Sequence, residues 1–203
     1  MIGAAGTARA AVARSAAALT ALAAPAAAAC PDAADLARGV ELVMAGPITF
    51  TARAPGLIEA YQPGGDADYA TWSRAGVVPL RHVIHEPDGT RDTIEIAWDA
   101  DPMALPDPRP GTSWHLRGRY PAVAGQAAQS IALAVDWGAA ETVALGGCTT
   151  AAVAGDFALT YEGEGWTDRR RVVWLAAPGF AVEGPAGATA AEVVRGRVLR
   201  PVP

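Results

Sequence analysis

Lysine and asparagine are both absent from this chain of 203 residues, so every positively charged side chain other than histidine is an arginine. The codons of both missing residues are rich in adenine, so their absence is typical of a GC-rich bacterial genome and says nothing about function. Acidic residues outnumber arginines by 21 to 16. Because an acidic chain has no long-range attraction for nucleic acid or anionic lipid, we expect neither as a partner.

Long apolar segments are missing after residue 29, where no uncharged run approaches the length of about 18 residues that a membrane-spanning helix needs. The N-terminal segment has the three-part layout of a signal peptide. Arg9 and Arg14 come first, an uncharged alanine-rich run follows, and the small residues Ala27 to Ala29 precede the expected cleavage point. We therefore interpret residues 1–29 as a cleaved signal peptide, which places the mature protein in the periplasm or outside the cell.

Cysteine is scarce, with Cys30 as the first expected mature residue and Cys148 as the second of two. Two thiols in an oxidising compartment tend to pair, and closing so long a loop stabilises a domain by about 4 kcal/mol in the chain-entropy model. The alternative is a lipid anchor on Cys30, although Ala27 stands where lipobox sequences favour Leu, Val or Ile. Neither cysteine has a histidine or second cysteine at metal-ligand spacing. We expect a disulfide.

Hydrophobic periodicity predicts an all-β fold for residues 30–203, which are enough for a single domain. Residues 32–39 carry the capping signals of one short helix. After them, apolar residues alternate with period two in short runs separated by turns, and the last runs lie near Val182 and over residues 193–199. The prediction is an antiparallel sheet of about a dozen short strands, curled into a half-barrel, barrel or sandwich, with most of the six tryptophans in its core.

Sequence motifs for catalysis are weak. His82 and His85 are three residues apart, so on a strand they face opposite sides and cannot share one metal ion. The segment from Gly111 to His115 resembles a nucleophile elbow around Ser113, but it ends in histidine where glycine is required, and it enters a strand from a loop. No glycine-rich phosphate loop or cysteine–histidine cluster occurs. We therefore predict no catalytic residue, metal ligand or cofactor.

Positively charged strand faces are the candidates for contact with a ligand or partner: His115, Arg117, Arg119, Arg169 and Arg171. We expect the first three to point outward, although an inward-facing arrangement would line a polar cavity. In the second group, the strand period places Arg170 on the face opposite to its two neighbours. We expect this cluster to pair across a hairpin with Glu162 and Glu164, which stabilises the fold by only about a few tenths of a kcal/mol.

Three short motifs carry a resemblance to a known group of proteins: the segments 30–39, 146–149 and 175–180, which read CPDAADLARG, GGCT and LAAPGF. In these the chain resembles uncharacterised exported β-rich proteins of alphaproteobacteria, whose mature chains also begin with Cys-Pro and a short helix. The third motif is also similar to the closing hairpin of envelope half-barrel β-sheet proteins. The resemblance implies that the two cysteines belong to one framework. It carries no established activity, so it assigns no functional residue.

A non-catalytic binding or envelope-maintenance role is the expected function, with an unknown envelope protein or a small apolar ligand as partner. A carrier of an apolar or amphipathic ligand would have a sizeable apolar concavity. A structural or partner-binding protein would have a packed interior and one exposed apolar patch. A hydrolase would need His85 or His115 close to a carboxylate or a serine.

Overall fold

The computed structural model describes residues 30–43, 46–123 and 127–202, and the predicted signal peptide lies outside these ranges. One set of strands consists of β1 (Val40–Val43), β2 (Pro47–Ala54), β3 (Leu57–Gln62), β4 (Asp68–Arg74), β5 (Val78–His85), β6 (Arg91–Glu95) and β13 (Val198–Pro201). The other consists of β7 (Ala97–Trp98), β8 (Ser113–Tyr120), β9 (Gln129–Leu145), β10 (Cys148–Tyr161), β11 (Trp166–Leu175) and β12 (Phe180–Pro185). Three short helices complete the described elements: α1 (Ala33–Arg38), the 3-10 helix η1 (Pro102–Ala104) and α2 (Ala190–Val194).

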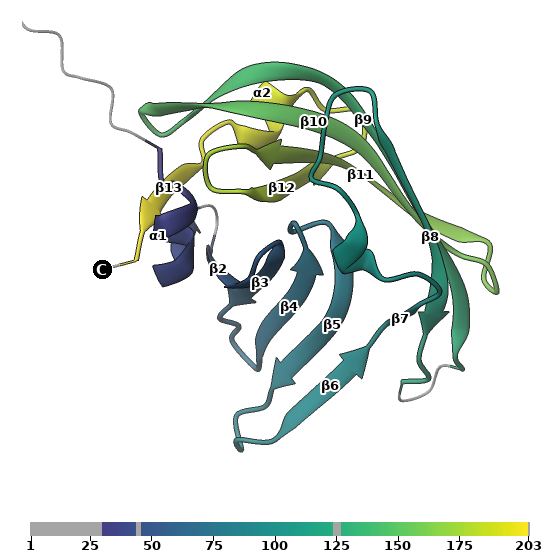
Figure 1. Ribbon diagram of the computed structural model, residues 1–203. Coiled ribbons are helices and arrows are strands. Elements are labelled where there is room, and N and C mark those ends of the chain that lie inside the picture. The colour runs from purple at the N-terminus through teal and green to yellow at the C-terminus, as the bar shows by residue number, and fades with distance from the viewer. Residues whose placement is uncertain (1–29, 44–45, 124–126, 203) are drawn as a thin grey trace, which may run out of the picture.

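The strands form two antiparallel sheets that face each other (Figure 1). The seven-stranded sheet has the order β13-β1-β2-β3-β4-β5-β6, and the six-stranded sheet has the order β12-β11-β10-β9-β8-β7. Neighbours in sequence are neighbours in space almost throughout, as expected for strands joined by short hairpins. The prediction of an all-β fold of about a dozen antiparallel strands is confirmed.

The chain passes from one sheet to the other at Ile96, which lies between β6 and β7. The Ile96 N–H still donates to the carbonyl of Leu80 in the seven-stranded sheet, at 2.8 Å, whereas Ala97 already pairs with Arg119 of the six-stranded sheet. At the opposite edges, no ladder joins β12 to β13 among the described residues, and α2 lies between them in the chain. The described strands therefore do not form a closed barrel, which excludes one of the three predicted shapes.

Both short α-helices begin with capping interactions. In the predicted helix, the Asp32 carboxylate accepts from the backbone N–H groups of Ala34 and Asp35. Helix α2 was not predicted, and the expected strand over residues 193–199 is wrong at its start. Thr189 and Glu192 form a reciprocal capping box there, and β13 begins only after the helix ends. A helix of five residues is too short to show helical periodicity.

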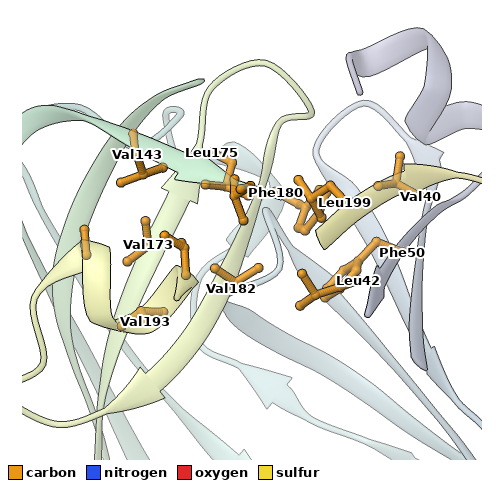
Figure 2. Packing of buried hydrophobic residues seen from close by; sticks show 14 of the residues in the cluster. Val40, Leu42, Phe50, Val143, Val173, Leu175, Phe180, Val182, Val193 and Leu199 are labelled. Atoms are coloured by element: carbon orange, nitrogen blue, oxygen red, sulfur yellow. The ribbon is translucent and has the colours of Figure 1, made fainter. Parts of the chain in front are cut away.

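Buried side chains form two clusters, which lie on opposite faces of β10, β11 and β12. In the first, valine, leucine and phenylalanine side chains of β1, β2, β11, β12 and α2 pack together (Figure 2). In the second, Trp114 and Trp137 meet edge to face with ring centroids 5.2 Å apart. Trp98 and Trp174 pack against this cluster, whereas Trp166 is 54% exposed at the start of β11.

Cys30 and Cys148 form a disulfide bond across a sequence separation of 118 residues. Cys148 is buried at the start of β10, so the bond fixes the first described residue to the β9–β10 hairpin. The sulfur atom of Cys30 is thereby engaged. A thioether to lipid would need that same sulfur atom, so the bond is incompatible with the lipid-anchor alternative.

Candidate ligand-binding cavity

A cavity of about 460 Å³ lies between the two sheets. Its lining is contributed by strands from both sheets and by the segment that precedes β13: Leu42, Ile48, Phe50, Ala60, Gln62, Thr71, Ser73, Gly76, Val77, Pro79, His82, Phe157, Leu159, Tyr161, Asp168, Arg170, Ala181, Val182, Glu183 and Arg197. Small-molecule sites in proteins span about 300–1,000 Å³ and combine apolar walls with a few polar groups. This cavity has both properties.

The wall formed by the seven-stranded sheet follows directly from strand register. Phe50 pairs with Ala60, Ala60 with Thr71, and Thr71 with His82, so these four side chains form one row across β2, β3, β4 and β5. Directly paired residues lie on the same face of a sheet. The row therefore changes from apolar to polar as it crosses the sheet.

The opposite wall contains an ion-paired group of three residues. The guanidinium of Arg170 lies 2.5 Å from a carboxylate oxygen of Asp168 and also pairs with Glu183 of β12. Burial lowers the pKa of Arg170, but the hydrogen bonds and charges of Asp168 and Glu183 outweigh burial, so its pKa is above the ordinary value. Each carboxylate thus has Arg170 as its counter-ion.

Arg197 approaches the same group from the turn between α2 and β13. Its Nη2 donates to the backbone carbonyl of Glu183 at 2.6 Å, which supplies a partner for a carbonyl on the edge strand β12. The side chain is half-buried, and burial lowers its pKa while the charge of Glu183 acts in the opposite direction. Among the described residues, no carboxylate oxygen forms a salt bridge with Arg197.

Aromatic rings continue from the polar side of the cavity toward the surface. The ring of His82 is 6.5 Å from that of Tyr120, Tyr120 is 6.0 Å from Tyr161, and Tyr161 is 5.1 Å from the exposed Trp166. The Nδ1 atom of His82 is 3.1 Å from the hydroxyl of Thr71, and burial lowers the pKa of the imidazole. Burial also raises the pKa values of Tyr120 and Tyr161. Neutral rings are therefore favoured along this side.

The five predicted contact residues all lie away from the cavity lining. His115, Arg117 and Arg119 are exposed on β8, as expected, and the first two border a shallow hollow on the outer face of the six-stranded sheet. Arg169 and Arg171 lie on the strand face opposite to Arg170. The structure therefore does not bring either group to the cavity.

The expected pairing of the arginine cluster with Glu162 and Glu164 is wrong. Register places Arg171 opposite Asp156, and their side chains are 2.8 Å apart. Glu162 lies 3.7 Å from Arg117 instead, and Gln129 donates to Glu164. Glu162 and Glu164 lie in the hairpin that joins β10 to β11, beyond the residues of β10 that pair with the arginines. The register of β10 and β11 therefore gives the arginines other neighbours.

Arg170 and Arg197 were not predicted as cavity residues, although the sequence contains one indication for Arg170. Asp168 and Arg170 alternate with outward residues and share a strand face with Val172. Charged residues on an otherwise apolar strand face are costly to bury unless they are paired, so they mark a polar site within the core. Glu183 and Arg197 carried no such pattern, because they come from an edge strand and a turn.

The features that a hydrolase would need do not converge on the cavity. His85 is on the other face of its strand from His82, beside Tyr61, whose hydroxyl donates to Asp68. That hydrogen bond lowers the pKa of Asp68 and raises that of Tyr61. In the described part of the chain, no group of three or more His, Cys, Asp or Glu residues could hold a metal ion. The helices described there are also too short or too polar to span a membrane.

Comparison with known proteins gives little guidance. No protein-family model and no curated protein matches the chain. Among solved structures, the chain is similar to the hypothetical lipoprotein YmcC from Escherichia coli K12, with 11% sequence identity and a TM-score of 0.45. The match covers 71% of this chain and 77% of that protein.

Proposed function

We propose that this protein is exported and holds an apolar or amphipathic small molecule, without catalysis, in the cavity between its two sheets. The cavity of about 460 Å³, with an apolar wall and a short row of polar groups, is the observation that carries this proposal. Its size lies in the lower half of the usual range of about 300–1,000 Å³ for small-molecule sites. A ligand with one hydrocarbon chain fits such a volume better than one with several.

The polar groups of the cavity favour binding over catalysis. Asp168 and Glu183 are both engaged by Arg170, so neither carboxylate is free to act as a general base. His82 is another lining residue that could act as a general base near neutral pH, and its Nδ1 atom lies within hydrogen-bond distance of the hydroxyl of Thr71. A serine or carboxylate next to this imidazole would support a hydrolase, and the described lining does not place one in contact with it.

A surface for a protein partner has weaker support. The large apolar side chains exposed in the described chain are Tyr69, Trp166 and Val198. They belong to β4, β11 and β13, and none of these strands is hydrogen-bonded to another of the three. A partner-binding function would be favoured by one contiguous apolar patch.

Export is supported by the disulfide and by the layout of residues 1–29. Disulfides persist in oxidising compartments such as the periplasm, and the same N-terminal segment has the charge and small-residue pattern of a signal peptide. The resemblance to exported β-rich proteins of alphaproteobacteria agrees with this proposal. Expression of the full chain in a secreting bacterium tests it. The mature N-terminus should be Cys30, and the intact mass should be two hydrogens below that of the dithiol. Unprocessed protein with reduced thiols in the cytoplasm would contradict export.

Binding is tested with a cavity-filling variant. Native mass spectrometry and calorimetry should detect one molecule of a single-chain amphiphile such as lauric acid per protein. Ala60→Trp places an indole in the cavity row between Phe50 and Thr71, and should weaken binding by at least about tenfold through steric exclusion. Ala158→Trp is the matched control, because Ala158 borders the hollow on the outer face.

The two variants give outcomes that decide the proposal. Circular dichroism first establishes that both variants are folded. Loss of binding in the cavity variant alone supports the proposal. Absence of binding by the wild-type protein, or equal binding by both variants, would contradict it.

A further inference from the structure

Arg197 differs from the other charged groups of the cavity in the way its charge is balanced. Arg170 forms direct ion pairs with both Asp168 and Glu183, so this group holds one positive and two negative charges. Arg197 makes a hydrogen bond to a backbone carbonyl and, among the described residues, no salt bridge with a carboxylate. A guanidinium has five N–H donors, so most of its hydrogen-bonding capacity is left for another partner.

Burial makes this arrangement unfavourable in the empty protein. The side chain of Arg197 is half-buried in the cavity wall, and removal of its charge from water costs free energy that a carbonyl dipole only partly offsets. The lowered pKa of the guanidinium has the same cause. An anion placed against Arg197 would give it a direct ion-pair partner and accept two parallel hydrogen bonds from its planar fork.

The neighbours of Arg197 determine the rest of the ligand. Leu42, Ile48 and Phe50 line the cavity from β1 and β2, and Val182 lines it from β12. These side chains suit a hydrocarbon chain. A small inorganic anion would leave this apolar surface uncovered, and a neutral alkane would leave Arg197 without a direct ion-pair partner.

We infer that the cavity takes a single-chain amphiphile with one terminal acidic group, whose anionic head pairs with Arg197 while its chain lies between the sheets. This inference rests on the proposed function, because it requires that the cavity bind a ligand at all. It adds the chemical class of the ligand and the residue that selects it. Arg170 pairs with both Asp168 and Glu183, which reduces but does not cancel the repulsion between these carboxylates and an anionic head group.

A matched ligand series tests the inference on the wild-type protein. Lauric acid, lauramide and dodecyltrimethylammonium share one chain length and differ in the charge of the head group. Calorimetry at slightly alkaline pH, below the micelle concentrations, should show that the acid binds about tenfold to a hundredfold more tightly than the amide, and the ammonium most weakly. Acetate is the short-chain arm, and it should bind far more weakly than lauric acid because it lacks the hydrocarbon chain.

Substitution of the arginine tests its assignment. Arg197→Gln should reduce the preference for acid over amide to about onefold, and Arg197→Lys should retain part of it. Arg195→Gln removes the same charge from an exposed position two residues earlier and should leave the preference unchanged. Binding of the uncharged amide reports whether each variant keeps its cavity.

The outcomes separate the inference from the proposed function. Equal binding of acid and amide by the wild type would overturn the inference while the proposed function stands. A preference for the acid that survives in Arg197→Gln would also overturn it, since another group would then be the selector. If no member of the series binds the wild type, the proposed function fails and the inference fails with it.

Discussion

Phe50 of β2 and Phe180 of β12 stack nearly parallel, with ring centroids 4.2 Å apart and an interplanar angle of 15° (Figure 2). The two strands belong to different sheets, so this pair joins the sheets across the interior. Phe50 also lines the cavity, whereas Phe180 is fully buried. The stacked pair therefore sets the separation of the sheets next to the proposed ligand.

Truncation of Phe180 should destabilise the protein strongly. Phe180→Ala removes a buried ring from the contact between the sheets and leaves a void, and such changes cost about 3–5 kcal/mol. Denaturant unfolding of the oxidised protein measures the loss. Trp166→Ala is the control, because this larger aromatic side chain is mostly exposed and its truncation should cost far less. Equal losses for the two variants would mean that the sheets are not held together through Phe180.

Loss of the disulfide should destabilise the domain through the unfolded state. A bond that closes a loop of 118 residues restricts the unfolded chain by about 4–5 kcal/mol in the chain-entropy model. The double variant Cys30→Ser, Cys148→Ser should lose up to this amount and should unfold at the same denaturant concentration as the reduced wild type. If the oxidised and reduced wild-type proteins unfold together, the two cysteines do not constrain the chain.

The cavity histidine should give the protein a pH-dependent stability. Burial lowers the pKa of His82 in the folded state, so between that value and the unfolded value of about 6.5 the unfolded chain binds more protons. Stability should therefore be fully present above about pH 6.5 and decrease as the pH falls through this window. Carboxylates also titrate in acid, so the measurement is the difference between wild type and His82→Gln at each pH. A difference that does not change with pH would show that the imidazole titrates equally in both states.

Strand periodicity predicted the sheets well because it depends on local sequence. The run from Trp114 to Tyr120 alternates in burial along β8 as predicted, and the polar residues between them face outward. The helix that starts at Asp32 also followed from its local capping signals. These features require no knowledge of distant contacts.

The candidate site could not be predicted in the same way, because its residues meet through tertiary contacts. Arg170 pairs with Glu183 across two strands, and Arg197 reaches the same strand from beyond α2. The sequence analysis selected Arg169 and Arg171 because charge density is visible in sequence. The packing of the sheets determines which face of β11 points toward the other sheet. That face carries Arg170, and the opposite face carries Arg169 and Arg171.

Helix α2 is held against the edge strand β12 by a close contact between Gly184 and Val193. A Cβ atom added to Gly184 would lie 2.6 Å from a methyl carbon of Val193, which is buried. Gly184→Ala should therefore destabilise the protein by about 1–3 kcal/mol through overpacking. Gly163→Ala is the control, since nothing lies within 4 Å of an added Cβ at Gly163.

A double-mutant cycle separates this contact from a general effect of glycine. Val193→Ala removes the methyl groups that collide with the new Cβ atom, so Gly184→Ala should cost less in the Val193→Ala background than in the wild type. The coupling between residues in contact is about 0.5–3 kcal/mol. Additive losses in the two backgrounds would show that α2 does not pack on β12 through this pair. Because α2 leads directly to the turn that carries Arg197, the same double variant should restore the affinity for lauric acid if Gly184→Ala alone weakens it.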